Sequence, residues 1–208
     1  MLRCKEENVF FERLFQHKKI AAVKHPKSIE KAIMLKDQIS AVFLLTGNIM
    51  SVKKYVDLLK NEGIPVFVHI EKIGGISMDN EGLDFVANYV RPLGIVSTKP
   101  NLIAKARKRK LMTIQRIFMI DTEVYDHALH IVEQHQPDLI EIMPSRLPQV
   151  IRELSQKVHV PLITGGLLSE KAHAVEALEN GAVGVSTSNI DVWKADLSMK
   201  EDVQKVTS

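Results

Sequence analysis

Residues 161–188, PLITGGLLSEKAHAVEALENGAVGVSTS, contain a complete strand–helix–strand unit. Two short apolar runs, at 161–164 and 183–186, flank a segment whose apolar residues recur at helical spacing. Ser169 predicts the start of this helix and Gly181 predicts its end. Two strands joined by one helix form a parallel pair, because a parallel connection needs a crossover of about a dozen residues.

Strand candidates of the same kind recur along the whole chain, with their first residues 19 to 29 positions apart. Each is a short apolar run bounded by turn residues, and amphipathic helical patterns lie between the runs. Runs that are apolar throughout indicate burial on both faces and therefore a parallel sheet covered by helices. The eight predicted strands are 20–23, 41–45, 65–70, 94–96, 113–120, 139–143, 161–164 and 183–186.

Eight such units in 208 residues predict an α/β fold, a compact single-domain (βα)8 TIM-like barrel. An open doubly wound sheet is the main alternative, but it usually carries a glycine-rich loop after its first strand, where this chain has Lys24-His25-Pro26. Apolar residues at helical spacing near the amino terminus predict an N-terminal capping helix that closes one end of the barrel. We expect this helix within residues 1–18, the barrel over 19–194 and a polar C-terminal tail over 195–208.

The composition places the chain among ordinary globular proteins, with 45% hydrophobic and 25% charged residues. The single cysteine, Cys4, has no partner for a disulfide within the chain, which fits a reducing compartment. No apolar run reaches the roughly 18 residues of a membrane span. The first residues are too charged for a signal peptide. The sequence therefore predicts a cytoplasmic protein that makes no membrane contact.

The turns after the last two predicted strands carry residues suited to binding an anion. Glycine lets the backbone approach a ligand closely, and a Ser-Thr-Ser run that opens a short helix offers hydroxyls and free amides. A lone Gly-Gly more often only forms a tight turn, but the loops after strands seven and eight are where barrels commonly hold phosphate. The predicted phosphate-binding residues are Gly165, Gly166, Ser186, Thr187 and Ser188.

Four more polar side chains are expected at the same mouth of the barrel, namely Lys24, His69, Lys99 and Glu141. Glu141 interrupts an apolar strand, and a buried charge without a partner is costly, so we expect it to pair with Arg116, Lys99 or a ligand hydroxyl. An ion pair that serves only the fold is an equal alternative. His69 on an apolar strand fits a hydrogen-bonded core histidine better than an acid–base group. No His, Cys and Asp spacing predicts a metal site.

The net charge of +3 conceals an uneven distribution. Residues 1–110 carry 20 Lys and Arg against 11 Asp and Glu, whereas residues 111–208 carry 8 against 14. Such an asymmetry indicates a polyanion as partner for one part of the surface. The steepest part is the run Lys105, Arg107, Lys108, Arg109 and Lys110. A solvated helix end whose cations complement the helix dipole is the alternative interpretation of this run.

Ordered motifs span about 170 residues of the chain. They are KHPK at 24–27, FLLTGN at 43–48, VFVHI at 66–70, GIVSTK at 94–99, IQRIFMID at 114–121, EIMP at 141–144, TGGL at 164–167 and VSTS at 185–188. In this order they resemble the glycerol-3-phosphate-responsive antiterminator family, regulators of bacterial glycerol-uptake operons. The chain departs from the family pattern at Gly74-Gly75-Ile76-Ser77 and at Thr164, and neither change removes the predicted anion site.

The resemblance implies a (βα)8-like fold, glycerol 3-phosphate as effector ligand, no cofactor, and binding to the leader of an mRNA. The ligand-bound protein would prevent transcription termination there and would have no catalytic activity. The basic run at 105–110 would then contact RNA phosphates. The resemblance leaves open whether the chain forms a homo-oligomer. The alternative is a small TIM-barrel enzyme for a phosphorylated substrate, with Glu141 or His69 as general base and Lys99 as electrophile. A relic that binds only a partner protein is the third hypothesis.

Overall fold

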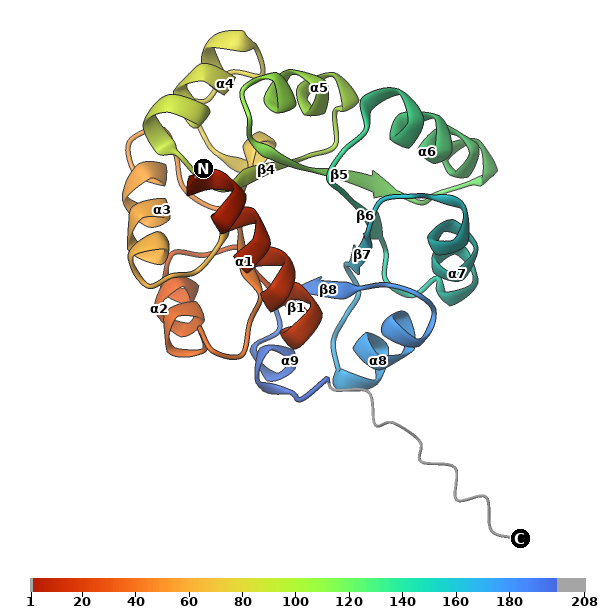
Figure 1. Cartoon of the computed structure of the whole chain (residues 1–208). Coiled ribbons are helices and arrows are strands. Elements are labelled where there is room, and N and C mark those ends of the chain that lie inside the picture. The colour runs from red at the N-terminus through yellow and green to blue at the C-terminus, as the bar shows by residue number, and fades with distance from the viewer. Residues whose placement is uncertain (1, 198–208) are drawn as a thin grey trace, which may run out of the picture.

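The computed structural model describes residues 2–197, and side chains from residue 5 onward. Eight parallel strands close into a barrel in chain order, with β1 hydrogen-bonded to both β2 and β8 (Figure 1). The strands are β1 Lys19–Val23, β2 Ala41–Leu44, β3 Val66–His69, β4 Gly94–Ser97, β5 Met112–Phe118, β6 Leu139–Met143, β7 Leu162–Gly165 and β8 Gly184–Thr187. The predicted barrel is confirmed, and every strand end lies within two residues of its predicted position.

Helices alternate with the strands and surround the barrel (Figure 1). They are α1 Leu2–His17, α2 Lys27–Met34, α3 Val52–Asn61, α4 Asn80–Phe85, α5 Pro100–Lys108, α6 Thr122–His135, α7 Pro148–Lys157, α8 Lys171–Glu179 and α9 Ile190–Lys194. A π-helical segment, Val86–Val90, continues α4. Pro100 and Pro148 begin α5 and α7, because proline's fixed φ suits a first helical position and its missing N–H costs nothing there.

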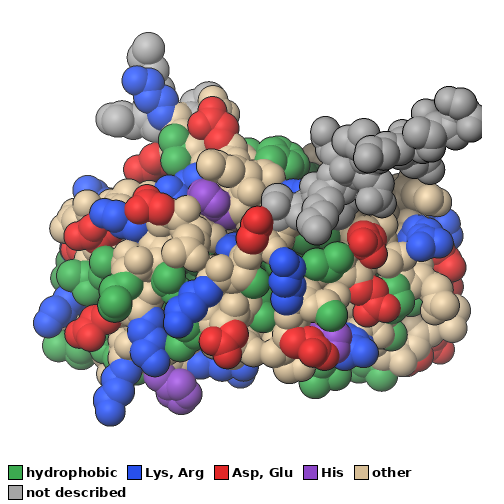
Figure 2. Space-filling view, turned by 90° about the horizontal axis from the view of Figure 1, so that it is seen from below, with side chains coloured by type: hydrophobic (Ala, Val, Ile, Leu, Met, Phe, Trp, Pro, Cys, Tyr) green, Lys and Arg blue, Asp and Glu red, His purple; other side chains and the backbone are tan. Residues whose placement is uncertain are grey.

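Charged side chains of both signs cover the outward side seen in Figure 2. Among residues 2–197, no helix combines the length and the apolar content that crossing a lipid bilayer requires. The predicted C-terminal tail lies outside the described residues from position 198 onward. Of its first three residues, Leu197 is buried, and Lys19 Nζ donates a hydrogen bond to the carbonyl of Ala195. These residues therefore pack against the barrel.

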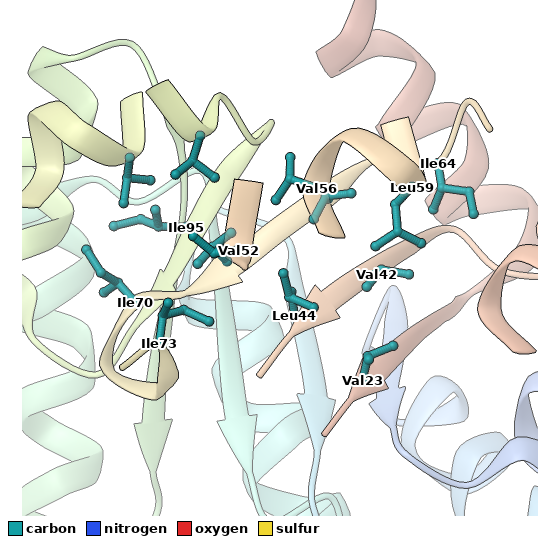
Figure 3. Packing of buried hydrophobic residues seen from close by; sticks show 14 of the residues in the cluster. Val23, Val42, Leu44, Val52, Val56, Leu59, Ile64, Ile70, Ile73 and Ile95 are labelled. Carbon is teal, nitrogen blue, oxygen red and sulfur yellow. The ribbon is translucent and has the colours of Figure 1, made fainter. Parts of the chain in front are cut away.

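The apolar core between the sheet and the helices follows from strand alternation. Every second side chain of β2 points outward, so Val42 and Leu44 contact the layer of helices. Val56 and Leu59 of α3 face them from the other side (Figure 3). All four side chains are fully buried. This packing holds each helix against its two neighbouring strands.

The capping helix is confirmed at the amino-terminal end of the barrel, where α1 crosses the opening (Figure 1). Phe10 and Leu14 of α1 are fully buried among inward side chains of the strands. The Phe10 and Phe67 rings meet edge to face, with centroids 4.8 Å apart. A Cβ on Gly184 would lie 2.7 Å from Cδ1 of Leu14, so a glycine here lets the helix approach β8. The barrel is therefore closed at this end, and its other end is left for a ligand.

Candidate functional site

A cavity of about 330 Å³ lies at the carboxyl end of the barrel, where β1, β5, β6, β7 and β8 end. Five of the residues predicted for the ligand site line it, namely Lys24, Gly166, Ser186, Thr187 and Ser188. The other lining residues are Ala22, Leu45, Lys72, Arg116, Phe118, Met143, Leu167 and Leu168. Groups that are more than 160 positions apart in the sequence thus meet in one cavity.

Strand alternation explains which side chains reach the cavity. On β5, Met112 and Ile114 point into the barrel core, and Arg116 and Phe118 continue the same inward row up to the cavity. The outward row of β5 includes Ile117, which packs against helices instead. The polar residue Arg116 therefore stands directly above an apolar layer.

A buried polar network forms the floor of the cavity. Arg116 and Glu141 are register partners on β5 and β6, and Nε of Arg116 donates to Oε2 of Glu141 at 2.7 Å. The hydroxyl of Ser186 donates to the other carboxylate oxygen, Oε1. Glu141 is fully buried, so these contacts supply the partners that a carboxylate in an apolar strand needs. Of the partners predicted for Glu141, Arg116 is the one that binds it in the structure.

Arg116 has hydrogen-bonding capacity left over. It lines the cavity with only 5% of its surface exposed. Its terminal nitrogens, Nη1 and Nη2, donate no hydrogen bond to any residue between 2 and 197. A guanidinium presents five N–H donors in a fixed plane that suits a carboxylate or phosphate. Arg116 can therefore hold Glu141 through one edge and an anion through the other.

The two predicted glycines have different roles. A Cβ on Gly165 would lie 3.0 Å from Oε1 of Glu141 and closer still to Oγ of Ser186, so this glycine makes room for the floor network and does not line the cavity. Gly166 lines the cavity with φ +75°, a conformation that favours glycine. Its carbonyl accepts hydrogen bonds from the N–H (3.1 Å) and the hydroxyl (2.7 Å) of Ser145, which fix the orientation of this turn.

The serine and threonine hydroxyls contribute less to the cavity than the sequence suggests. Ser186 is bonded to Glu141, and Thr187 donates to the carbonyl of Leu168 at 3.0 Å and accepts the N–H of Asn189 at 3.0 Å. Two of the three hydroxyls expected to bind phosphate are therefore used within the fold, Ser186 to join β8 to β6 and Thr187 to join the β7 and β8 turns. Ser188 is exposed at the cavity and has no such bond to a described residue.

Backbone N–H groups in the turns after β7 and β8 are free to bind a ligand. The N–H groups of Gly166, Leu167, Leu168 and Ser188 donate to no acceptor within residues 2–197. All four residues line the same cavity. Free amides of successive turn residues form a concave site that attracts anions.

The charge of the cavity lining is positive. Lys24, Lys72 and Arg116 contribute three cations, and no carboxylate is present among the described lining residues. Lys24 and Lys72 are exposed at the rim, whereas Arg116 lies deep. Lys and Arg side chains also gather at the lower left of Figure 2, at the end of the molecule opposite α1. A concave surface of one sign concentrates the opposite charge, so the cavity suits an anion.

His69 lies outside the cavity lining, in a second polar cluster between β3 and β4. Its Nδ1 atom is 2.9 Å from Oε2 of Glu71, a close contact without the alignment of a linear hydrogen bond. Glu71 also accepts from the hydroxyl of Ser97 at 2.6 Å and from the N–H of Thr98 at 2.9 Å. Burial by itself raises the pKa of Glu71, but the interactions with His69, Ser97 and its own backbone outweigh this and lower the pKa to about 2. His69 is therefore a buried histidine with a carboxylate partner.

Lys99 is exposed and does not line the cavity. It directly precedes α5, and its backbone N–H donates to the hydroxyl of Ser97 at 3.0 Å. Neither Lys99 nor either of the two general bases of the enzyme hypothesis, Glu141 and His69, lines the cavity. Among the described lining residues there is also no histidine or carboxylate that could act as a general base.

The basic run Lys105, Arg107, Lys108, Arg109 and Lys110 lies at the end of α5, near the amino-terminal end of the barrel. Two of its arginines hold neighbouring elements together. Arg109 binds the carboxylate of Asp84 through Nε at 2.7 Å and Nη2 at 3.0 Å, and this raises its pKa. Arg107 donates to the carbonyl of His135 at 3.3 Å. Lys108 and Lys110 are exposed.

Two residues of the cavity could not be predicted as such from the sequence. Lys72 follows β3 in a single 3₁₀ turn, Ile70–Lys72, whose geometry turns this residue toward the mouth. Arg116 was recognised only as a partner for Glu141, because a sequence does not show how many donors of a guanidinium remain free. The alternation of β5 was the available signal, since Arg116 stands two residues beyond inward-facing Ile114.

Comparisons with known proteins agree with this architecture. The family model described as "Glycerol-3-phosphate responsive antiterminator" matches residues 19–193. The uncharacterized protein YgcP of Escherichia coli strain K12 is 34% identical over 180 residues, which cover 86% of this chain and 93% of YgcP.

Two solved structures share both fold and sequence. The glycerol uptake operon antiterminator regulatory protein of Listeria monocytogenes is 31% identical with a TM-score of 0.80, covering 86% of this chain and 95% of the other. A glycerol uptake operon antiterminator-related protein of Thermotoga maritima is 27% identical with a TM-score of 0.75, covering 85% and 98%. Aldolases at 14% identity and below share the fold alone. The chain belongs to the glycerol-3-phosphate responsive antiterminator family.

Proposed function

We propose that the protein binds glycerol 3-phosphate in the cavity at the carboxyl end of the barrel, and that the ligand-bound form binds the leader of an mRNA and prevents transcription termination. The observation that carries the ligand part is Arg116, a nearly buried guanidinium whose terminal nitrogens face the cavity without a described partner. The family match supports glycerol 3-phosphate as the anion.

The phosphate group is assigned to the side of the cavity formed by the β7 and β8 turns. There, the amides of Gly166, Leu167 and Ser188 are available, and the guanidinium of Arg116 adds a charge-assisted donor. Lys24 and Lys72 at the rim add positive potential that attracts a dianion. The carbon chain of the ligand then lies toward Met143 and Phe118, whose apolar surfaces limit the size of the ligand.

Calorimetric titration of the full chain with glycerol 3-phosphate tests this assignment. We expect Arg116→Gln to weaken binding by at least about 30-fold, since losing a buried charge contact costs about 2 kcal/mol or more. Because Arg116→Gln also leaves Glu141 without its charged partner, Lys72→Ala provides a second test. Lys72 is exposed, so its loss removes charge from the cavity without a cost to the fold.

Lys99→Ala is the matched control, since Lys99 is an exposed lysine near the same end of the barrel but outside the cavity. We expect it to bind glycerol 3-phosphate like the unmodified chain. Glycerol lacks the phosphate group and inorganic phosphate lacks the glycerol group, so each should bind more weakly than glycerol 3-phosphate. Equal affinity of Arg116→Gln, Lys72→Ala and the unmodified chain would contradict the assignment.

The regulatory part is tested by filter binding of a leader transcript with and without glycerol 3-phosphate. The ligand shifts RNA binding only if it binds the RNA-competent state more tightly. We expect tighter RNA binding with glycerol 3-phosphate present and no consumption of the ligand. An RNA affinity that is the same with and without glycerol 3-phosphate would contradict the proposed regulatory function. Turnover of a phosphorylated triose would favour the enzyme alternative.

A further inference from the structure

We infer that the RNA-contact surface is a basic groove at the amino-terminal end of the barrel, which binds the sugar–phosphate backbone of a single-stranded RNA segment. This inference rests on the proposed function. The groove has a volume of about 300 Å³ and is lined by Glu6, Lys60, Ala87, Arg91, Pro92, Leu93, Arg109, Lys110 and Leu111. Four of these residues are cations and one is a carboxylate.

Two of the four cations are already engaged within the protein. Arg109 binds Asp84, and Lys60 donates to the carbonyl of Arg91 at 3.0 Å with Glu6 3.6 Å away. Arg91 donates through Nε to the carbonyl of Asn88 at 2.7 Å, but neither Arg91 nor Lys110 forms an ion pair with a residue between 5 and 197. Both are exposed, so their charge is available to a partner.

The backbone at these two positions allows their charges to be removed without damage to the fold. Arg91 has φ +57° and Lys110 has φ +61°, at equivalent places just before β4 and β5. Before β3 and β8, glycines with positive φ occupy these places. The left-handed conformation costs a residue with a Cβ more than a cation usually gains from the helix dipole. Lys18 and Gln136 also have positive φ and lie outside the groove, so the conformation alone marks no function. Glycine fits this conformation at lower cost, so replacing Arg91 or Lys110 by glycine removes the charge without straining the backbone.

An apolar recess of about 250 Å³ adjoins the groove and shares Glu6, Lys60 and Leu93 with it. Its floor and walls include Val9 of α1, Ile64 and Pro65. The basic groove and the apolar recess together suit a single-stranded RNA segment. Such a segment presents its phosphates to the cations and an unstacked base to the recess. A duplex keeps its bases stacked, so only its phosphates would contact the protein, at the basic groove.

The test uses Arg91→Gly and Lys110→Gly, singly and combined, in the full chain with saturating glycerol 3-phosphate. Each change removes one cation and also relieves the left-handed backbone, so we expect the melting temperature to stay the same or rise. Binding of the leader transcript should weaken, and the slope of log affinity against log salt should become shallower by about one per removed cation.

Lys18→Gly is the matched control, because Lys18 is a third cation with positive φ, at +58° before β1, and lies outside the groove. We expect unchanged RNA binding for this variant. A single-stranded oligonucleotide should compete for the transcript better than a duplex of the same length.

The outcomes separate this inference from the proposed function. If the unmodified chain binds the transcript and the double variant retains its affinity and salt slope, the groove is excluded and the regulator stands. The groove is also excluded if Lys18→Gly weakens binding as much as the groove variants, or if a duplex competes equally well. If the unmodified chain binds no transcript, the proposed function fails together with the groove.

Discussion

Glu141 and Glu71 are two acidic residues near the carboxyl ends of their strands, and their surroundings give them different roles. Glu141 is fully buried and shares its charge with Arg116. Glu71 is 16% exposed and accepts hydrogen bonds from Ser97 and Thr98 while contacting His69. Neither carboxylate lines the cavity, so both serve to position other groups.

The low pKa of Glu71 makes a prediction about acid stability. Between its ordinary value of 4.5 and about 2, the unfolded chain binds a proton here and the folded chain does not. The stabilisation is therefore complete above pH 4.5 and is lost as the pH falls toward 2. The full effect is about 3 kcal/mol, of which about 2 kcal/mol is lost by pH 3.

Urea unfolding of the unmodified chain and of Glu71→Gln, at pH 6 and pH 3, measures this effect. We expect the unfolding free energy of the unmodified chain to fall by about 2 kcal/mol more than that of the variant. Equal decreases in the two proteins would show that Glu71 has the same pKa in both states.

At the scale of elements, α1 closes the amino-terminal end of the barrel and completes its core. Phe10 is fully buried against Phe67, whereas Phe15 on the same helix is 55% exposed. We expect Phe10→Ala to lower the unfolding free energy by about 3–5 kcal/mol because it leaves a cavity in a packed core. Phe15→Ala, the matched control, should change it by about 0.5 kcal/mol or less. Chemical denaturation that gives equal effects for both variants would contradict the capping role of α1.

The elements that could be predicted from the sequence are those with one dominant signal. Strands buried on both faces consist almost entirely of apolar residues, and in β3 only the last residue, His69, is polar. Prolines mark the first residues of α5 and α7. The π-helical segment Val86–Val90, which continues α4 and contacts α3, has no such signal in the sequence. Tertiary contacts decide such segments.

The ligand site could be predicted only in part, for a related reason. Gly166 in the turn after β7 marked the position of the cavity, since a glycine that adopts positive φ is visible in a sequence as a residue type. Which hydroxyls are free depends on contacts between distant elements, as with Thr187 and Leu168. Lys99 and His69 belong to the same end of the barrel, yet they turn away from the cavity.

For the molecule as a whole, the proposed ligand cavity and the proposed RNA groove lie at opposite ends of the barrel. The cavity is at the carboxyl end and the basic groove at the amino-terminal end. Strand β5 joins them directly, since Lys110 precedes its first residue and Arg116 lies near its last. The residue proposed to bind the ligand and a cation of the proposed groove therefore lie near the two ends of one strand.

A crystal structure of the protein grown with glycerol 3-phosphate would show where the ligand binds. We predict phosphate oxygens within about 3.2 Å of the terminal nitrogens of Arg116 and of the backbone amides of the β7 and β8 turns. Ligand bound elsewhere, or only water beside Arg116 at saturating ligand, would contradict the claim.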